Sequence, residues 1–121
     1  MLVTREFTFD AAHHLDNYHG KCERMHGHTY RLQVTVKGEI QNNGMVVDFV
    51  LLKKVVNRYV ISKLDHQLLN EVVKNPSTER LVIWIWKQLN KIGVLMKSEA
   101  SDVGYNAEVS ALLKSKKDFF L

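Results

Sequence analysis

The stretch His26-Gly27-His28-Thr29-Tyr30-Arg31-Leu32-Gln33-Val34-Thr35-Val36 decides the fold of this chain. Its even-numbered residues are two histidines, a tyrosine, a leucine and two valines, whereas the odd-numbered ones are glycine or polar. Successive side chains of a β-strand point to opposite faces, so this alternation is typical of a strand with one apolar face. The sequence therefore predicts a strand that starts at His26 and ends at Gly38.

The sequence on both sides extends this strand into a sheet. Residues 3–13 alternate in the same way, and one parity consists of Val3, Arg5, Phe7, Phe9, Ala11 and His13. Residues 14–25 lack apolar periodicity and contain turn-forming residues, so we expect a loop. After Gly38, Asn42-Asn43-Gly44 is typical of a turn, and Met45-Val46-Val47 follows it. These residues predict an antiparallel hairpin with the strand before them.

Two helices are predicted next. Asp48 is placed to cap a helix that ends near Lys63, and its apolar positions at helical spacing are Leu51, Leu52, Val55, Val56, Tyr59 and Val60. Ser77 or Thr78 is placed to cap a second helix that Gly93 would end, with Glu79 favourable in its first turn. The buried stripe expected of this helix is Leu81, Val82, Ile85, Trp86, Leu89 and Ile92.

A last strand is expected over 94–99, with a short partner near 105–109. The order of these elements predicts the α+β class, with an antiparallel four-stranded sheet and two helices on one of its faces. The edge strands of so small a sheet would be unpaired in a monomer. We therefore expect the sheet to pair with further copies of the chain.

Composition narrows the class of protein. The 121 residues and a hydrophobic content of 45% predict a single domain over residues 1–121. No apolar run is long enough to span a bilayer and no charged leader precedes one, so we expect a cytoplasmic protein with no membrane partner. The single cysteine, Cys22, cannot close an intrachain disulfide, which suits the reducing cytosol. The net charge of +4 is spread along the chain, which argues against nucleic acid and fits either a small anionic substrate or a solvated surface with a mild basic excess.

Three histidines form a candidate zinc site. Side chains at i and i+2 of a strand point alike, so His26 and His28 can converge on one ion. A catalytic zinc ion takes three protein ligands and keeps a fourth position open, and His13, at the end of the preceding strand, is the candidate third ligand. The alternative is that the pair only decorates a half-buried strand. We interpret His14 and His19 as bystanders.

Proton-transfer groups are also present. Cys22 stands four residues before His26, and a nearby divalent cation would lower the pKa of its thiol, making it a candidate general base. The alternative is a small buried hydrophobe, which its charged neighbours disfavour. Asp65-His66 follows a helix end and is either a proton shuttle or a cap followed by a surface histidine. Glu99 is a carboxylate in a predicted apolar strand and could bind a donor-rich edge of a ligand.

Four motifs in order carry a family resemblance: Phe9-Asp10-Ala11-Ala12-His13, Cys22-Glu23-Arg24-Met25-His26-Gly27-His28, Leu64-Asp65-His66 and Asn75-Pro76-Ser77-Thr78-Glu79. Together they closely resemble the 6-pyruvoyltetrahydropterin synthase family, which includes 6-carboxytetrahydropterin synthases. The resemblance spans residues 3 to about 100. It implies the tunnelling fold, in which trimers close their sheets into a barrel and two trimers stack into a homohexamer with active sites between subunits.

The resemblance also implies roles for the site residues. Zinc, the only cofactor, would be bound by His13, His26 and His28. Cys22 would accept a proton, and Asp65 and His66 of a neighbouring subunit would complete its relay. The substrate would be the pterin 7,8-dihydroneopterin triphosphate, with the zinc polarising its side-chain hydroxyls.

Glu99 would anchor the pterin ring, with Ser77, Thr78 and Glu79 near it. Residues 100–121 depart from the family pattern as a longer, lysine-rich C-terminal extension. Because the anchor lies directly before this extension, Glu108 is a rival for the role.

The expected activity is a zinc-dependent lyase that makes 6-carboxytetrahydropterin on the way to deazapurine-modified nucleosides. A pyruvoyl product and a hydroxymethyl product for folate synthesis are alternatives within the family. Glu23 stands three residues before His26, the position of the glutamate in the members that release 6-hydroxymethyl-7,8-dihydropterin. We therefore hypothesise two activities, one through each of Cys22 and Glu23, unless Glu23 is a solvent-facing charge. A non-catalytic pterin- or metal-binding module would need neither Cys22 nor the Asp65-His66 pair.

Overall fold

The computed structural model of the chain describes residues 1–16, 24–99 and 108–120. It contains three long strands, β1 (Leu2–His13), β2 (His26–Lys37) and β3 (Glu108–Phe120). A first helix runs without a break through α1 (Phe49–Val56), the π-helical turn η2 (Asn57–Ile61) and α2 (Ser62–Leu64). The short 3-10 helix η3 (Leu69–Glu71) leads to the long helix α3 (Thr78–Glu99). Within the described ranges, no helix combines the length and apolarity needed to cross a membrane.

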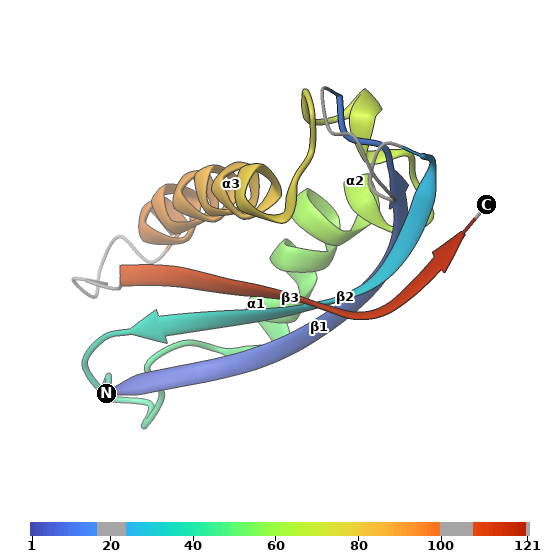
Figure 1. Cartoon of the computed structure of the whole chain (residues 1–121). Coiled ribbons are helices and arrows are strands. Elements are labelled where there is room, and N and C mark those ends of the chain that lie inside the picture. Colours follow the sequence, from blue (N-terminus) through green and yellow to red (C-terminus); the bar gives the residue numbers. More distant parts are fainter. Residues whose placement is uncertain (17–23, 100–107, 121) are drawn as a thin grey trace.

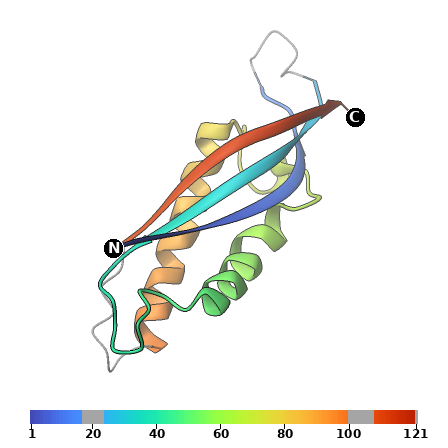
Figure 2. The same ribbon diagram turned by 90° about the horizontal axis from the view of Figure 1, so that it is seen from below.

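The strands form one antiparallel sheet in the order β1-β2-β3, with β2 in the centre. The sheet is strongly twisted, and the first helix and α3 both lie against the same side of it (Figures 1 and 2). The predicted α+β class, with an antiparallel sheet and two helices on one face, is therefore confirmed. The described residues contain three strands where four were expected.

The hydrophobic core lies between the sheet and the two helices. From Phe7 on β1 and from Tyr30 on β2, the predicted apolar parity is the buried one, including Phe9, Tyr30 and Leu32. The helices contribute Leu52, Val56, Val60, Leu64, Leu81, Ile85 and Leu89 to the same cluster. Alternation in the sequence thus translates directly into the inner face of the sheet.

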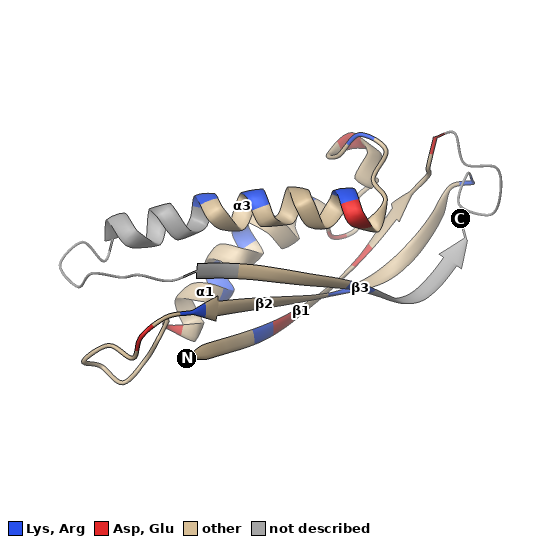
Figure 3. Cartoon of the chain, turned by 60° about the vertical axis from the view of Figure 1, so that its left-hand side comes forward, with Lys and Arg blue, Asp and Glu red and all other residues tan. Residues whose placement is uncertain are grey.

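The opposite face of the sheet is polar and cross-linked between β1 and β2. The hydroxyls of Thr4 and Thr35 are 2.8 Å apart, and Thr29 donates a 2.6 Å hydrogen bond to Asp10. Arg31 forms an ion pair with Glu6 across the same two strands. Figure 3 shows that basic and acidic residues occur on both the helices and the sheet.

The first helix buries residues at a strict spacing of four. Asp48 caps its start by accepting a 2.9 Å hydrogen bond from the backbone N–H of Val50, as the sequence predicted. Its most buried side chains are Leu52, Val56, Val60 and Leu64. With 3.6 residues per turn, such a series drifts by about 40° at each step in an α-helix. The wider π-helical turn η2 offsets this drift, so that the stripe keeps facing the sheet.

Helix α3 corrects two predictions. Ser77 caps it, accepting a 3.2 Å hydrogen bond from the backbone N–H of Arg80, but the helix continues past Gly93 to Glu99. The strand predicted over 94–99 is therefore wrong, because a short apolar run fits either structure and a single glycine does not end a helix. Trp86 is 49% exposed, since it lies beside the line of Leu81, Ile85 and Leu89 rather than on it. Of the predicted stripe, the side chain of Ile92 lies outside the described residues.

The strand predicted over 45–47 is also wrong. A turn does form around Gly44, whose backbone N–H donates to Gln41 at 2.9 Å, but Val46 and Val47 are buried without joining the sheet. The reason is that β1 and β3 already occupy both edges of β2. The C-terminal extension supplies β3, which begins inside the short partner strand predicted near 105–109, and is therefore part of the sheet rather than a tail.

Gly93, which was predicted to end a helix, and Gly44 of the predicted turn should respond oppositely to alanine. In a helix interior, Gly93→Ala should raise the free energy of unfolding by about 0.5–1 kcal/mol, because glycine loses more backbone entropy on folding. Gly44 has φ of 82° and open space around it, so Gly44→Ala should lower the free energy of unfolding by about 1 kcal/mol through backbone strain alone. Urea unfolding of both variants measures the two effects. A loss of stability in Gly93→Ala would restore the predicted helix end.

Candidate functional site

Three histidines meet where β1 ends and β2 begins. The strand register pairs His13 directly with His26, while His28 pairs with Ala11. His28 is therefore the diagonal neighbour of His13, and all three side chains belong to the buried parity of the sheet. The three histidine side chains therefore continue the line of buried apolar side chains at the end of the sheet.

The ring nitrogens converge on one point. The Nε2 atom of His13 lies 3.0 Å from Nε2 of His26 and 2.9 Å from Nε2 of His28. The three rings meet edge to face, with centroids 4.5, 4.8 and 4.6 Å apart. One ligand atom of each residue lies within 4.8 Å of the others, which makes the trio a group that can hold a metal ion.

Backbone carbonyls fix which nitrogen each of two rings presents. The Nδ1 atom of His13 is 2.6 Å from the carbonyl of Pro76, and Nδ1 of His26 is 2.7 Å from the carbonyl of Arg24. A carbonyl only accepts, so Nδ1 carries the proton in both rings and Nε2 keeps its lone pair. Burial lowers the pKa of His13, and the two neighbouring imidazoles lower it further. Neutral rings with lone pairs facing one another fit a cation between them.

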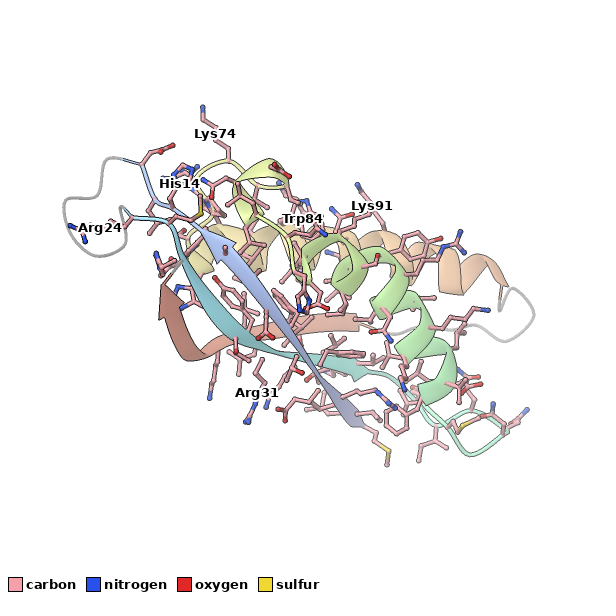
Figure 4. The ribbon with its side chains drawn as sticks, turned by 90° about the vertical axis from the view of Figure 1, so that its right-hand side faces the viewer. His14, Arg24, Arg31, Lys74, Trp84 and Lys91 are labelled. Carbon is pink, nitrogen blue, oxygen red and sulfur yellow. The ribbon has the colours of Figure 1, made fainter. Side chains whose placement is uncertain are left out.

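Aromatic packing supports the third ligand. Tyr30 is fully buried, stacks on Phe9 at 5.0 Å and meets the ring of His28 at 5.4 Å and 64°. The core thus extends to the rings of the ligands. His14 and Arg24 lie at the same end of the molecule, on the segments that leave β1 and lead into β2 (Figure 4).

Several predicted site residues can now be placed. Cys22, Glu23 and the bystander His19 lie outside the described residues. His14 is not a member of the three-histidine group; its Nδ1 lies 3.5 Å from Asp16. This is consistent with the interpretation of His14 as a bystander.

Asp65 and His66 lie together at the end of the first helix. The Nδ1 atom of His66 is 3.0 Å from Oδ1 of Asp65, and that oxygen also accepts a 3.0 Å hydrogen bond from the backbone N–H of Asp10. His66 is exposed and lines a hollow of about 410 Å³ with Asp10, Ala11, Ala12, Met25, Gln67 and Leu68. It adopts φ of 57°, a left-handed conformation that is costly for a residue other than glycine.

The start of α3 lies next to the histidines. The carbonyl of Pro76 binds His13, and Ser77, Thr78 and Glu79 follow directly as the cap and first turn of the helix. These three predicted substrate-binding residues therefore follow in sequence a residue that contacts the cluster, and their role stays a prediction. The positive end of the helix dipole, which favours anions, lies there as well.

The two candidate anchor residues lie far from the cluster within one chain. Glu99 ends α3, roughly 30 Å along the helix axis from Thr78. Glu108 pairs with Lys37, at the end of β2 remote from His26 and roughly 35 Å from it.

The strand register instead places Asp118 opposite His28. The sequence interpretation missed this residue because it treated residues 100–121 as an extension. The available signal for a strand there was that the odd-numbered residues Val109, Ala111 and Leu113 are all apolar.

Comparison with known proteins agrees with this geometry. The family model of 6-pyruvoyl tetrahydropterin synthase matches residues 2–110. A 6-carboxy-5,6,7,8-tetrahydropterin synthase of Haemophilus influenzae is 34% identical over 107 residues, covering 84% of this chain and 74% of the relative. One of Synechocystis is 37% identical over 100 residues, covering 77% and 78%. A dihydroneopterin monophosphate aldolase of Pyrococcus furiosus is 45% identical over 84 residues, covering 69% and 70%.

Solved structures share the fold. The 6-pyruvoyl tetrahydropterin synthase of Caenorhabditis elegans superposes with a TM-score of 0.68 at 24% identity, covering 97% of this chain and 96% of that one. The protein of the same description from Plasmodium falciparum gives a TM-score of 0.63 at 22% identity, covering 96% and 98%. At these identities the likeness establishes the arrangement of sheet and helices.

The metal-free protein should lose stability on acidification through His13. The pKa of this imidazole lies below its ordinary value of 6.5 in the folded chain, so the unfolded chain takes up the proton first as the pH falls. Its contribution to stability is therefore complete above pH 6.5 and is lost as the pH falls through the folded pKa. Urea unfolding with a chelator present, from about pH 7 to about pH 5, should show a steeper decline for wild type than for His13→Gln. Parallel declines would contradict this assignment.

The backbone of His66 gives a second prediction. Glycine adopts the left-handed conformation without steric cost, so His66→Gly should be more stable than His66→Ala by about 1 kcal/mol. Both variants lack the imidazole, which isolates the backbone term. Urea unfolding of the pair measures it, and equal stabilities would show that φ at this residue is not strained.

Proposed function

The chain belongs to the 6-pyruvoyl tetrahydropterin synthase family, and we propose that it is a zinc-dependent lyase that converts 7,8-dihydroneopterin triphosphate into 6-carboxy-5,6,7,8-tetrahydropterin. Two relatives with this name cover most of its length. The observation that carries the proposal is the convergence of three imidazole Nε2 atoms at the sheet end. The product would feed the synthesis of deazapurine-modified nucleosides.

Zinc is the metal that the donor set favours. Three neutral imidazoles suit zinc, whereas magnesium and calcium prefer oxygen ligands. Zn–N bonds of 2.0–2.1 Å in a tetrahedral arrangement separate the ligand nitrogens by about 3.3 Å. The separations of 3.0 and 2.9 Å from His13 are close to this value. When bound, zinc would polarise the side-chain oxygens of the substrate as a Lewis acid.

Cys22 is the proposed proton acceptor. It stands four residues before His26, on the segment that joins β1 to β2, and a thiol near a divalent cation has a lowered pKa. The thiolate would remove a proton from a side-chain carbon of the pterin whose oxygens the metal site polarises. Elimination of triphosphate, addition of one water molecule and loss of acetaldehyde from the side chain would then leave the carboxy product.

Asp65 and His66 would complete the relay for a neighbouring subunit. The side chain of His66 is exposed, and it is not part of the histidine cluster of its own chain. This supports a site shared between copies in a homohexamer of two trimers. In such a shared site, Glu99 would anchor the pterin from across the interface. Asp118, which pairs with His28, is a second candidate anchor from the same chain.

A second product is favoured by one relative and one residue. The Pyrococcus furiosus protein is named for an aldolase activity on a dihydroneopterin phosphate, and Glu23 stands three residues before His26 in this chain. A carboxylate and a thiolate differ in basicity and reach, so they would remove protons from different side-chain positions. We propose the carboxy product through Cys22 and 6-hydroxymethyl-7,8-dihydropterin through Glu23. A pyruvoyl product, which retains all side-chain carbons, is the further alternative.

A product assay tests the function. Purified protein incubated with 7,8-dihydroneopterin triphosphate should give the carboxy product by mass spectrometry. Cys22→Ala should keep its zinc and lose roughly 100- to 10,000-fold in the rate of that product, because general-base catalysis contributes this much. Glu23→Ala should lose only the hydroxymethyl product.

His14→Ala is the matched control, because it removes an imidazole next to His13 that is not part of the cluster. It should keep both products. Full carboxy-product turnover in Cys22→Ala would refute its role, and absence of the hydroxymethyl product from wild type would remove Glu23 from the mechanism. Tight pterin binding without any turnover would identify a binding module instead.

A further inference from the structure

A segment of the chain runs along the free edge of β1 where that strand ends. We call residues 65–76 the clamp segment. It bonds to every second residue of the chain from Asp10 to Asp16. The backbone N–H of His66 donates to the carbonyl of Asp10 at 2.6 Å, and the N–H of Ala12 donates to the carbonyl of Gln67 at 3.1 Å. These are the first two rungs, and both are backbone bonds of the kind that join strands.

The next two rungs are made by asparagine side chains. The amide of Asn70 accepts from the N–H of His14 at 3.0 Å and donates to the carbonyl of His14 at 3.0 Å. Asn75 accepts from the N–H of Asp16 at 2.8 Å. A primary amide offers one acceptor and two donors, so Asn70 replaces a strand residue as the partner of His14. The edge of β1 is thereby held beyond the last residue of the strand.

That last residue is the metal ligand His13. Its ring is held by the same segment, through the 2.6 Å contact from Nδ1 to the carbonyl of Pro76. The clamp segment therefore contacts the imidazole of His13 directly. Through Asn70 it also binds the backbone of the next residue, His14. On the N-terminal side of His13, the backbone is held by Gln67.

Residues with a strained backbone conformation lie at both ends of this series of hydrogen bonds. His66 has φ of 57° and Asn75 has φ of 46°, and they are the only residues other than glycine with positive φ in the described parts of the chain. Asparagine tolerates this conformation better than most residues. Such strain persists only where surrounding contacts fix it, and it concentrates at functional sites.

We propose that Asn70 and Asn75 are positioning residues for the metal ligand His13. By holding the backbone of residues 14–16, they keep Nε2 of His13 at hydrogen-bond distance from Nε2 of His26 and His28. The proposal rests on the metal site of the proposed function but not on its reaction or product. Neither asparagine touches the ligand atoms.

The test is zinc affinity, measured by competition with a chromophoric chelator. Asn70→Ala removes both bonds to His14, and Asn75→Gly removes the bond to Asp16 while keeping the positive φ without strain. Each variant should bind zinc about 10- to 100-fold more weakly, the usual effect of losing a partner that orients a ligand. The visible absorption of bound Co²⁺, which depends on the coordination geometry, should change with it.

Two variants separate positioning from general stability. Asn75→Asp keeps a side-chain oxygen that can accept from Asp16 and should retain near wild-type affinity. Asn43→Ala removes a similar 3.0 Å bond, from the N–H of Met45, in a turn at the other end of β2, and should leave zinc affinity and the Co²⁺ spectrum unchanged. Urea unfolding of the metal-free proteins shows that each variant is folded.

The outcomes are distinct. Unchanged zinc affinity and Co²⁺ spectra in Asn70→Ala and Asn75→Gly would overturn the positioning role while leaving the metal site intact. If Asn70→Ala fails to fold, the comparison of Asn75→Gly with Asn75→Asp decides. Wild type that binds no zinc would overturn both this inference and the zinc dependence of the proposed function.

Discussion

The register between β1 and β2 is the constraint on which the rest of the structure depends. It sets Phe9 opposite Tyr30 in the core and His13 opposite His26 at the end of the same row. A slip of one residue would turn the alternate side chains to the other face, so core and ligands would be lost together. The hydrophobic effect that fixes the sheet therefore also sets the three histidines side by side at its end.

Much of the fold was predictable from the sequence, because the spacing of apolar residues and the residues that cap helices are local signals. The alternation before His13 and after His26 located two strands, and Asp48 and Ser77 located two helix starts. Only the start of the third strand was predicted, because its partner is 71 or more residues away in sequence, as in the pairing of Lys37 with Glu108, and a local pattern does not specify a long-range partner. The same limit explains the strand that was wrongly assigned to 94–99.

The three histidines could be predicted for the same reason. His26 and His28 are at positions i and i+2 of one strand and His13 ends the preceding strand, and both features can be read from a short stretch of sequence. What the sequence did not reveal was how His13 is held. The carbonyl of Pro76 contacts its ring and Asn70 binds the backbone of the next residue, His14, both from more than 55 residues away and through hydrogen bonds that leave no periodic signal. Hydrogen bonds from distant side chains to the backbone form only in the tertiary structure, whereas the spacing of His26 and His28 is set within a single strand.

The π-helical turn η2 has a consequence for the history of this fold. A turn with one residue more than an α-helical turn accommodates an insertion without shifting either flank, because Leu52 before it and Leu64 after it still face the sheet. A chain that lost one residue between Asn57 and Ile61 would return this turn to α-helical spacing and keep Asp65 and His66 at the same place beside β1. The middle of the helix can thus shorten by one residue while both of its ends stay fixed.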